Sequence, residues 1–167
     1  SHLYRCCSDR EITSYGWLYI MAIIDRYDRS IVGYEISSRA RTVEWLAAFD
    51  KAAKNRFPGG TRDQGLILQV DNGCQPTSHK FVKELYTCDV ALLYSAYATP
   101  EHNAHIERFF RTLKEEEIYY NLYETYSEAI TSIEAYIDFY NNHRIHSALG
   151  YLTPAEYYQQ SILQNVA

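Results

Sequence analysis

The first half of the chain places short apolar runs beside stretches with helical spacing. Gly16–Asp25 is a continuous apolar run, and residues 29–36 alternate between apolar and polar positions, so both are predicted strands. Asp28 and Arg29 supply a turn signal between them. The pattern therefore predicts an antiparallel β-hairpin.

An alternation of helix and strand follows the hairpin. Residues 41–55 carry apolar side chains at helical spacing, with Thr42 as a possible N-cap and the Phe-Pro-Gly-Gly segment 57–60 as the stop. Leu66–Val70 and Val90–Tyr94 are short runs typical of buried strands, and residues 78–86 between them have helical spacing. This order predicts an α/β sheet with parallel members.

The pattern is helical from about residue 101 onward. Helices are predicted over 102–117, after the possible cap Thr125, and after Thr153, where Pro154 stands in the first turn. The first of these helices has an apolar face beside a polar stripe. That stripe consists of Asn103, Glu107, Arg111 and Lys114.

Length and composition allow one compact domain. The 167 residues are 47% hydrophobic, which is enough to fill a single core, so we expect one unit over 1–167 with a helical C-terminal part. No apolar stretch approaches the roughly 20 residues that cross a bilayer, and no secretory leader opens the chain, so we expect a cytoplasmic protein without membrane contact. The four cysteines lack zinc or disulfide-framework spacing and are expected to be reduced thiols.

The charge balance limits how this chain could bind nucleic acid. It has 16 Lys and Arg against 21 Asp and Glu, a net charge of −5. Nucleic-acid-binding domains are often strongly basic, so local basic patches would have to make any DNA contact.

Asp71 and Glu107 are the leading candidates for chemistry. Asp71 follows the predicted strand Leu66–Val70, and Glu107 lies on an amphipathic helix, so the two carboxylates can converge at a sheet edge and hold a divalent metal. Each also has a plainer interpretation. Asp71 starts an Asp-Asn-Gly turn, and Glu107 is spaced to pair with Arg111.

A set of motifs carries a family resemblance over nearly the whole chain. The set includes Val70-Asp71-Asn72-Gly73, Glu107-Arg108-Phe109-Phe110, Tyr140-Asn141 and the segment 146–154. The sequence resembles the catalytic core of bacterial insertion-sequence transposases of the DDE type and is similar to retroviral integrase cores. The resemblance implies a ribonuclease H-like fold, a mixed sheet flanked by helices, in which two aspartates and a glutamate bind two Mg²⁺ or Mn²⁺ ions.

The first acidic residue departs from the family pattern. Relatives carry an aspartate, an aliphatic residue and a threonine several residues before the Gly-Trp hairpin. A shortened hairpin loop gives this role to Asp9, which we favour, while Glu11 before Ile12 and Thr13 is another candidate. If the usual spacing to Gly16 is kept, the acid falls near Cys7 and the site lacks a ligand.

The resemblance implies metal-dependent cleavage and strand transfer of DNA, with Asp9, Asp71 and Glu107 as catalytic metal ligands. It also implies homo-oligomers that act on element ends and a target duplex. Candidate DNA contacts are Asn103, Arg108, Arg111 and Lys114. A catalytically inactive remnant that keeps a DNA-binding or oligomerisation surface is the alternative, and a nuclease that cuts without joining is a third reading.

Several other features are assigned plainer roles. Asp25 is expected to be a hydrogen-bond partner in the hairpin turn rather than a metal ligand. His143 and His146 are expected to pack or hydrogen-bond, because no further Cys or His cluster completes a zinc site. No helix-turn-helix pattern is seen, so an N-terminal DNA-binding domain is expected to be absent from this sequence.

Overall fold

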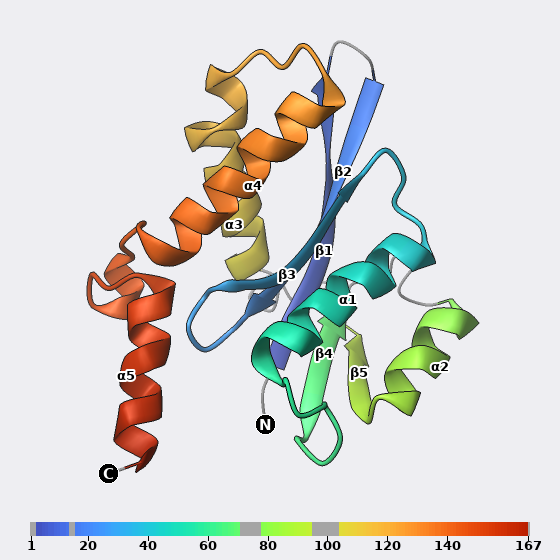
Figure 1. The fold of residues 1–167 in the computed structure, drawn as a ribbon, viewed down its shortest axis with the longest axis vertical. Coiled ribbons are helices and arrows are strands. Elements are labelled where there is room, and N and C mark those ends of the chain that lie inside the picture. Colours follow the sequence, from blue (N-terminus) through green and yellow to red (C-terminus); the bar gives the residue numbers. More distant parts are fainter. Residues whose placement is uncertain (1–2, 14–15, 71–77, 95–103, 167) are drawn as a thin grey trace.

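A mixed β-sheet forms the centre of the molecule (Figure 1). The computed structural model describes the backbone of residues 3–13, 16–70, 78–94 and 104–166, and the side chains of 16–70, 78–94 and 104–164. In this part of the chain the strands lie in the order β3-β2-β1-β4-β5. They are β1 (Leu3–Thr13), β2 (Gly16–Asp25), β3 (Ile31–Ser37), β4 (Leu66–Val70) and β5 (Val90–Tyr94).

The strand directions confirm the predicted hairpin and the predicted mixed sheet. β1, β2 and β3 pair antiparallel, whereas β1, β4 and β5 run parallel. β3 begins at Ile31 rather than at residue 29, because the turn extends to Ser30. The Asp25 N–H donates to the Ser30 carbonyl at 2.9 Å, and the Arg29 N–H donates to the Asp25 carbonyl at 2.9 Å.

Helices cover both faces of the sheet (Figure 1). α1 (Thr42–Arg56) and α2 (His79–Thr87) lie on one face, and α3 (Ala104–Glu116) and α4 (Tyr126–Asn142) lie on the other. α5 (Pro154–Val166) packs beside the β2–β3 turn, where the rings of Tyr27 and Tyr157 are 5.3 Å apart. The predicted C-terminal helices are therefore confirmed.

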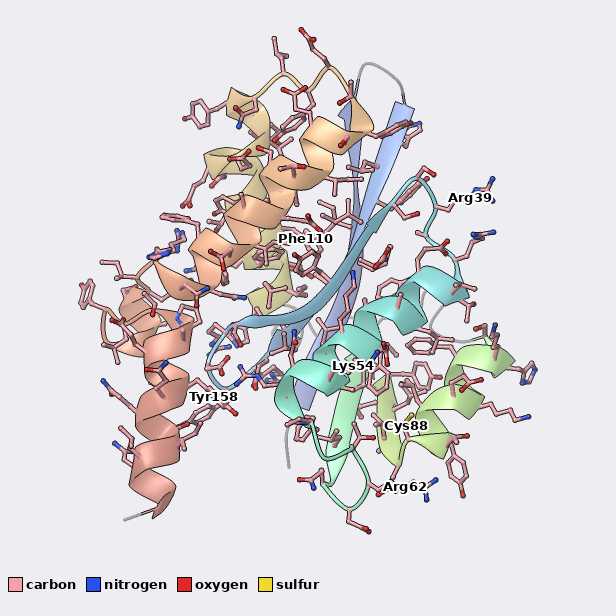
Figure 2. The ribbon with its side chains drawn as sticks, in the orientation of Figure 1. Arg39, Lys54, Arg62, Cys88, Phe110 and Tyr158 are labelled. Carbon is pink, nitrogen blue, oxygen red and sulfur yellow. The ribbon has the colours of Figure 1, made fainter. Side chains whose placement is uncertain are left out.

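Successive residues of β2 supply two separate apolar cores, because side chains alternate between the faces of a strand. Ile20, Ala22 and Ile24 pack under α3 and α4, whereas Met21 and Ile23 pack under α1 and α2. The buried face of α3 is the predicted one, and Figure 2 shows Phe110 turned into the core from this helix. The continuous apolar run of β2 is thus explained by burial on both faces.

Close packing of α1 on β3 requires a glycine at position 33. A Cβ built there would lie 2.4 Å from the Ala48 carbonyl oxygen and 2.5 Å from the Ala52 nitrogen. Both are backbone atoms of a helix and cannot move aside independently. Any larger residue at this position would push α1 off the sheet.

The start of α1 corrects one expectation. Arg41, not Thr42, is the N-cap, and the Glu44 carboxylate accepts a hydrogen bond from the Arg41 N–H at 2.8 Å. The Thr42 hydroxyl instead lies 3.0 Å from the hydroxyl of Ser78, which caps α2. Thr42 therefore links the starts of two helices, a tertiary contact that local sequence does not reveal.

Two asparagines bind the backbone of the edge strand β3 where it begins. The Asn141 side chain accepts from the Ile31 N–H at 2.8 Å and donates to the Ile31 carbonyl at 2.9 Å. Asn55 donates to the Val32 carbonyl at 2.9 Å. Asn141 lies on α4 and Asn55 on α1, so both helical layers contact this end of the strand.

A buried ionic cluster joins α1, α5 and the β2–β3 turn. The Arg56 guanidinium pairs with the Asp28 carboxylate and stacks at 3.8 Å over the ring of Tyr158. Figure 2 labels Tyr158, which lies on α5. Asp28 is completely buried, and it also accepts from the backbone N–H and the hydroxyl of Ser30. The cluster fixes the turn against the helices.

We predict that Asp28→Ala lowers the free energy of unfolding by about 3–5 kcal/mol, because it leaves the buried guanidinium of Arg56 with only the more distant Asp25 carboxylate, 3.8 Å away. Urea denaturation followed by circular dichroism measures this loss. The matched control is Asp50→Ala, which breaks the exposed pair with Lys54 and should cost less than about 1 kcal/mol. Equal losses in the two variants would contradict the buried cluster's role.

Candidate metal-binding edge and DNA-facing helix

Glu107 lies in the first turn of α3 with an exposed side chain. Its neighbours Ile106, Phe109 and Phe110 are buried against the sheet, which fixes the rotation of the helix. Within the described part of the chain, no residue hydrogen-bonds or forms an ion pair with the Glu107 carboxylate, and the pairing considered for Arg111 is not seen. The carboxylate is therefore available as a hard oxygen ligand.

The strand β4, which lies between β1 and β5, leads the chain to Asp71. Its last residue, Val70, is fully buried and is paired with Cys6 of β1 and Tyr94 of β5. Asp71 itself, like Asn103, lies outside the described residues. Parallel strands end together at one edge of a sheet, which is where ligand sites form in α/β folds.

The backbone position of Asp9 is set by the long pairing of β1 with β2. Asp9 lies opposite Ile20, a residue of the core beneath α3 and α4. Cys6 lies beside Val70, so Asp9 follows three positions further along β1, about 10 Å beyond the end of β4. Cys7, the position given by the family spacing, is nearer that level and lies opposite Ala22.

The candidate DNA contacts divide between two faces of α3. Arg111 and Lys114 lie four and seven positions after Glu107 and share its edge of the helix. Arg108 is turned about 100° from Glu107 and lies on the neighbouring face. There it lines a hollow between α3 and the residues after α4, and Arg111 at the border of the two faces also lines it.

The two candidate histidines and Asp25 have the roles expected from the sequence. The His143 ring stacks on Phe139 with centroids 6.3 Å apart, and the His146 ring meets Tyr140 edge-on at 4.9 Å. The Asp25 carboxylate accepts from the Tyr27 N–H at 2.8 Å, so it is a turn partner as predicted.

Three basic residues near Arg108, namely Arg26, Arg29 and Arg144, were not predicted from the sequence to belong to a site. Arg29 was assigned only to the turn signal, and Arg144 was given no role. Arg26 was not considered. The structure brings them near Arg108, although they are far apart in the sequence, and no short motif could have shown this convergence.

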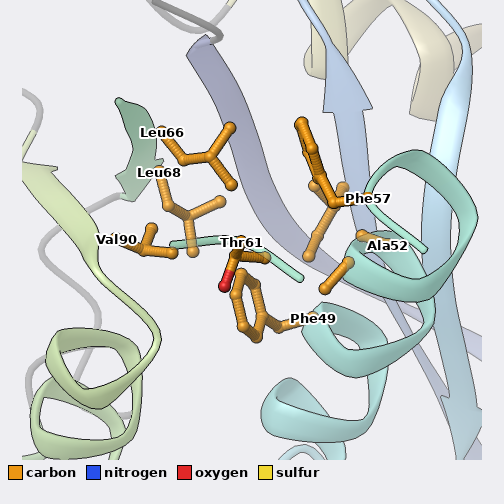
Figure 3. A pocket seen from close by; sticks show the side chains of 9 residues that line it. Phe49, Ala52, Phe57, Thr61, Leu66, Leu68 and Val90 are labelled. Carbon is orange, nitrogen blue, oxygen red and sulfur yellow. The ribbon is translucent and has the colours of Figure 1, made fainter. Parts of the chain in front are cut away.

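A separate small cavity lies between α1 and the sheet (Figure 3). Its volume is about 20 Å³, enough for one water molecule at most. Phe49, Phe57 and Leu68 are among its apolar lining residues, and the Thr61 hydroxyl beside it donates to the Cys88 carbonyl. This cavity belongs to the packing of the core and offers no chemistry.

The described residues alone contain no group of three or more His, Cys, Asp or Glu side chains able to hold a metal. The Asp71 side chain and the Asp9 side chain are not among them. The same residues include no helix that is both long and apolar enough to cross a membrane.

The fold is shared with the catalytic core of an integrase and the catalytic domain of a transposase. The catalytic core domain of HTLV-2 integrase, in complex with magnesium in a dimeric form, aligns with a TM-score of 0.69 at 14% identity, covering 92% of each chain. The catalytic domain of Mos1 transposase, with Raltegravir and Mn, aligns with a TM-score of 0.67 at 12% identity, covering 81% of this chain and 70% of that one. The predicted ribonuclease H-like α/β class is confirmed.

Sequence comparison gives the family within this class. Two models described as "Integrase core domain" match residues 7–100 and 88–154, so the chain belongs to the integrase core domain family. The transposase for insertion sequence element IS904 of Lactococcus lactis is 35% identical over 146 residues, covering 87% of this chain and 56% of that protein. This chain spans about half the length of the curated relatives it matches.

We predict that Glu107→Gln leaves the free energy of unfolding within about 0.5 kcal/mol of the wild type, because the side chain is exposed on the helix surface. The control is the preceding residue, since Ile106→Ala removes a fully buried side chain and should cost about 2–5 kcal/mol. Urea denaturation of both variants measures the difference. A large loss in Glu107→Gln would show that this residue supports the fold rather than a site.

Proposed function

We propose that this chain is the catalytic core of a DDE-type transposase, which cuts and joins DNA strands with divalent metal ions. The observation that carries the proposal is Glu107, an available carboxylate on a helix whose buried face fixes its direction, in a chain of the integrase core domain family. Membership of the integrase core domain family alone would not establish a function for this chain. A carboxylate at this place on this fold supplies the chemistry that the family needs.

The proposed metal ligands are Asp9, Asp71 and Glu107. Carboxylates suit this role because Mg²⁺ and Mn²⁺ prefer anionic oxygen ligands. The HTLV-2 integrase core and the Mos1 catalytic domain, which share the fold, are described with magnesium and with Mn. We propose two ions for this chain, held between the end of β4 and the first turn of α3.

The proposed reaction is attack on a DNA phosphorus atom by an oxygen nucleophile, water in cleavage and a 3′-hydroxyl in joining. The bond from phosphorus to the leaving oxygen breaks as the new bond forms, and no covalent enzyme intermediate is required. Bound metal ions would stabilise the attacking and leaving oxygens. Arg111 and Lys114 would hold phosphates of the same strand, because they share the edge of α3 that carries Glu107.

The proposed partners are DNA and further copies of this chain. Joining two element ends to a target requires more than one active core, and the HTLV-2 integrase core is described in dimeric and trimeric forms. The net charge of −5 means that DNA contact has to be local. The basic residues of α3 provide such a local surface.

The test is calorimetric titration of Mn²⁺ into the wild type and into Asp9→Ala, Asp71→Ala and Glu107→Ala. We expect each substitution to abolish or strongly weaken binding, because each removes one carboxylate of the proposed site. Glu84→Ala is the control, since its exposed carboxylate lies on α2, on the other face of the sheet, and its removal should leave binding unchanged.

The pattern among the variants separates the alternatives. Wild-type Mn²⁺ binding that survives Asp9→Ala, together with absence of strand transfer, would identify a core that lacks its first carboxylate. Binding that survives Glu107→Ala would overturn the proposed site itself. Strand transfer on DNA carrying the element ends should then be measured for the wild type and for Glu107→Ala, which we expect to be inactive.

A further inference from the structure

A hollow between α3, the β2–β3 turn and the residues after α4 has four arginines and two histidines among its lining residues. These are Arg29, His105, Arg108, Arg111, Arg144 and His146. The acidic residue in the described lining is Glu115. Glu116 binds Arg144 through both carboxylate oxygens at 2.7–3.1 Å and so offsets that charge. The other arginines leave the hollow with an excess of positive charge.

Two buried nitrogen atoms in this hollow have no hydrogen-bond partner. They are Nη1 of Arg29 and Nε2 of His146, and no other side-chain nitrogen or oxygen in the described part of the chain is buried in this way. Folded proteins satisfy nearly all buried polar groups, so each exception calls for an explanation. Both exceptions fall among residues that line the same hollow.

The positive charges around the hollow are close enough to affect one another. Burial, and then the charge of Arg26, lowers the pKa of Arg29. Arg29 also has a φ of 66°, a backbone conformation that is unfavourable for a residue with a long side chain. The fold therefore bears a cost to keep this arginine here.

We propose that this hollow binds one phosphate group of the DNA backbone, with the half-buried Arg29 and the exposed Arg108 as its donors. A phosphate supplies several anionic acceptor oxygens, which match the N–H groups of the two guanidinium groups. Arg111 lines the hollow and also borders the edge of α3 that carries Glu107. The phosphate held here would therefore flank the phosphate that reacts.

The choice of DNA as the source of the phosphate rests on the proposed function, whereas the anion site rests on the unpartnered Nη1 atom of the half-buried Arg29. Arg29→Met and Arg108→Gln test the site. The control is Arg39→Met, which removes an equal charge at an exposed position away from the hollow (Figure 2). The probes are inorganic phosphate, compared with chloride at equal ionic strength, and a labelled DNA duplex titrated at several salt concentrations.

We expect inorganic phosphate to raise the melting temperature of the wild type and of Arg39→Met, but not of Arg29→Met. Without phosphate, Arg29→Met should melt at or above the wild-type temperature, because it removes a half-buried charge whose Nη1 atom has no hydrogen-bond partner. Its Kd for the duplex should rise about tenfold. The slope of log affinity against log salt should fall by about one. Arg108→Gln should show the same changes to a smaller extent.

Two outcomes would overturn the proposal. A phosphate-dependent rise in melting temperature that persists in both Arg29→Met and Arg108→Gln would contradict the proposed anion site. Loss of that rise with an unchanged duplex affinity would assign the hollow to a small phosphate compound rather than to DNA. Neither measurement needs metal or strand transfer, so failure of the metal site at Glu107 would be seen separately in the Mn²⁺ titration.

Discussion

Burial of one face of α3 against the sheet is the contact on which the candidate site depends. Ile106, Phe109 and Leu113 are fully buried, so the helix cannot rotate without exposing them. This constraint places Glu107, Arg111 and Lys114 on one edge of α3 and Arg108 on the neighbouring face of the helix. The apolar residues therefore decide where the charged ones act, although they take no part in any chemistry themselves.

The segment after α3 supports this arrangement from behind. Tyr140 of α4 meets the Phe109 ring edge-on at 5.0 Å, and the His146 ring meets Tyr140 in turn. The Glu116 carboxylate accepts from the hydroxyl of Tyr136 at 2.7 Å and binds Arg144, joining the end of α3 to α4 and the residues that follow it. The Tyr-Asn and His-Ser-Ala-Leu-Gly motifs that carry the family resemblance are, in the structure, a brace for the helix that bears Glu107.

Local patterns in the sequence were sufficient for most elements of the fold. The bounds of β2, β4 and β5 followed from their apolar runs, and the buried face of α3 followed from helical spacing. β1 could be expected only from the family resemblance, because its polar residues are stabilised by pairing with β2 and β4 rather than by an apolar alternation. Thr42 was misassigned for a similar reason, since Ser78 is its partner.

The candidate site was less predictable than the fold. Glu107 could be chosen from its motif, but the position of Asp9 depends on a strand register that spacing alone leaves open. The convergence of Arg29 with Arg108 and Arg144 depends on a turn meeting two distant segments. Tertiary packing, not local preference, assembles such groups.

The two asparagines that bind the start of β3 have a consequence for how copies of this chain can associate. An edge strand ordinarily offers its free peptide groups to any passing strand. At Ile31 both peptide groups are already occupied by Asn141, and at Val32 the carbonyl is occupied by Asn55. Sheet-to-sheet extension at this end of β3 is thereby disfavoured, so pairing of two copies through a continuous sheet is not expected to begin there.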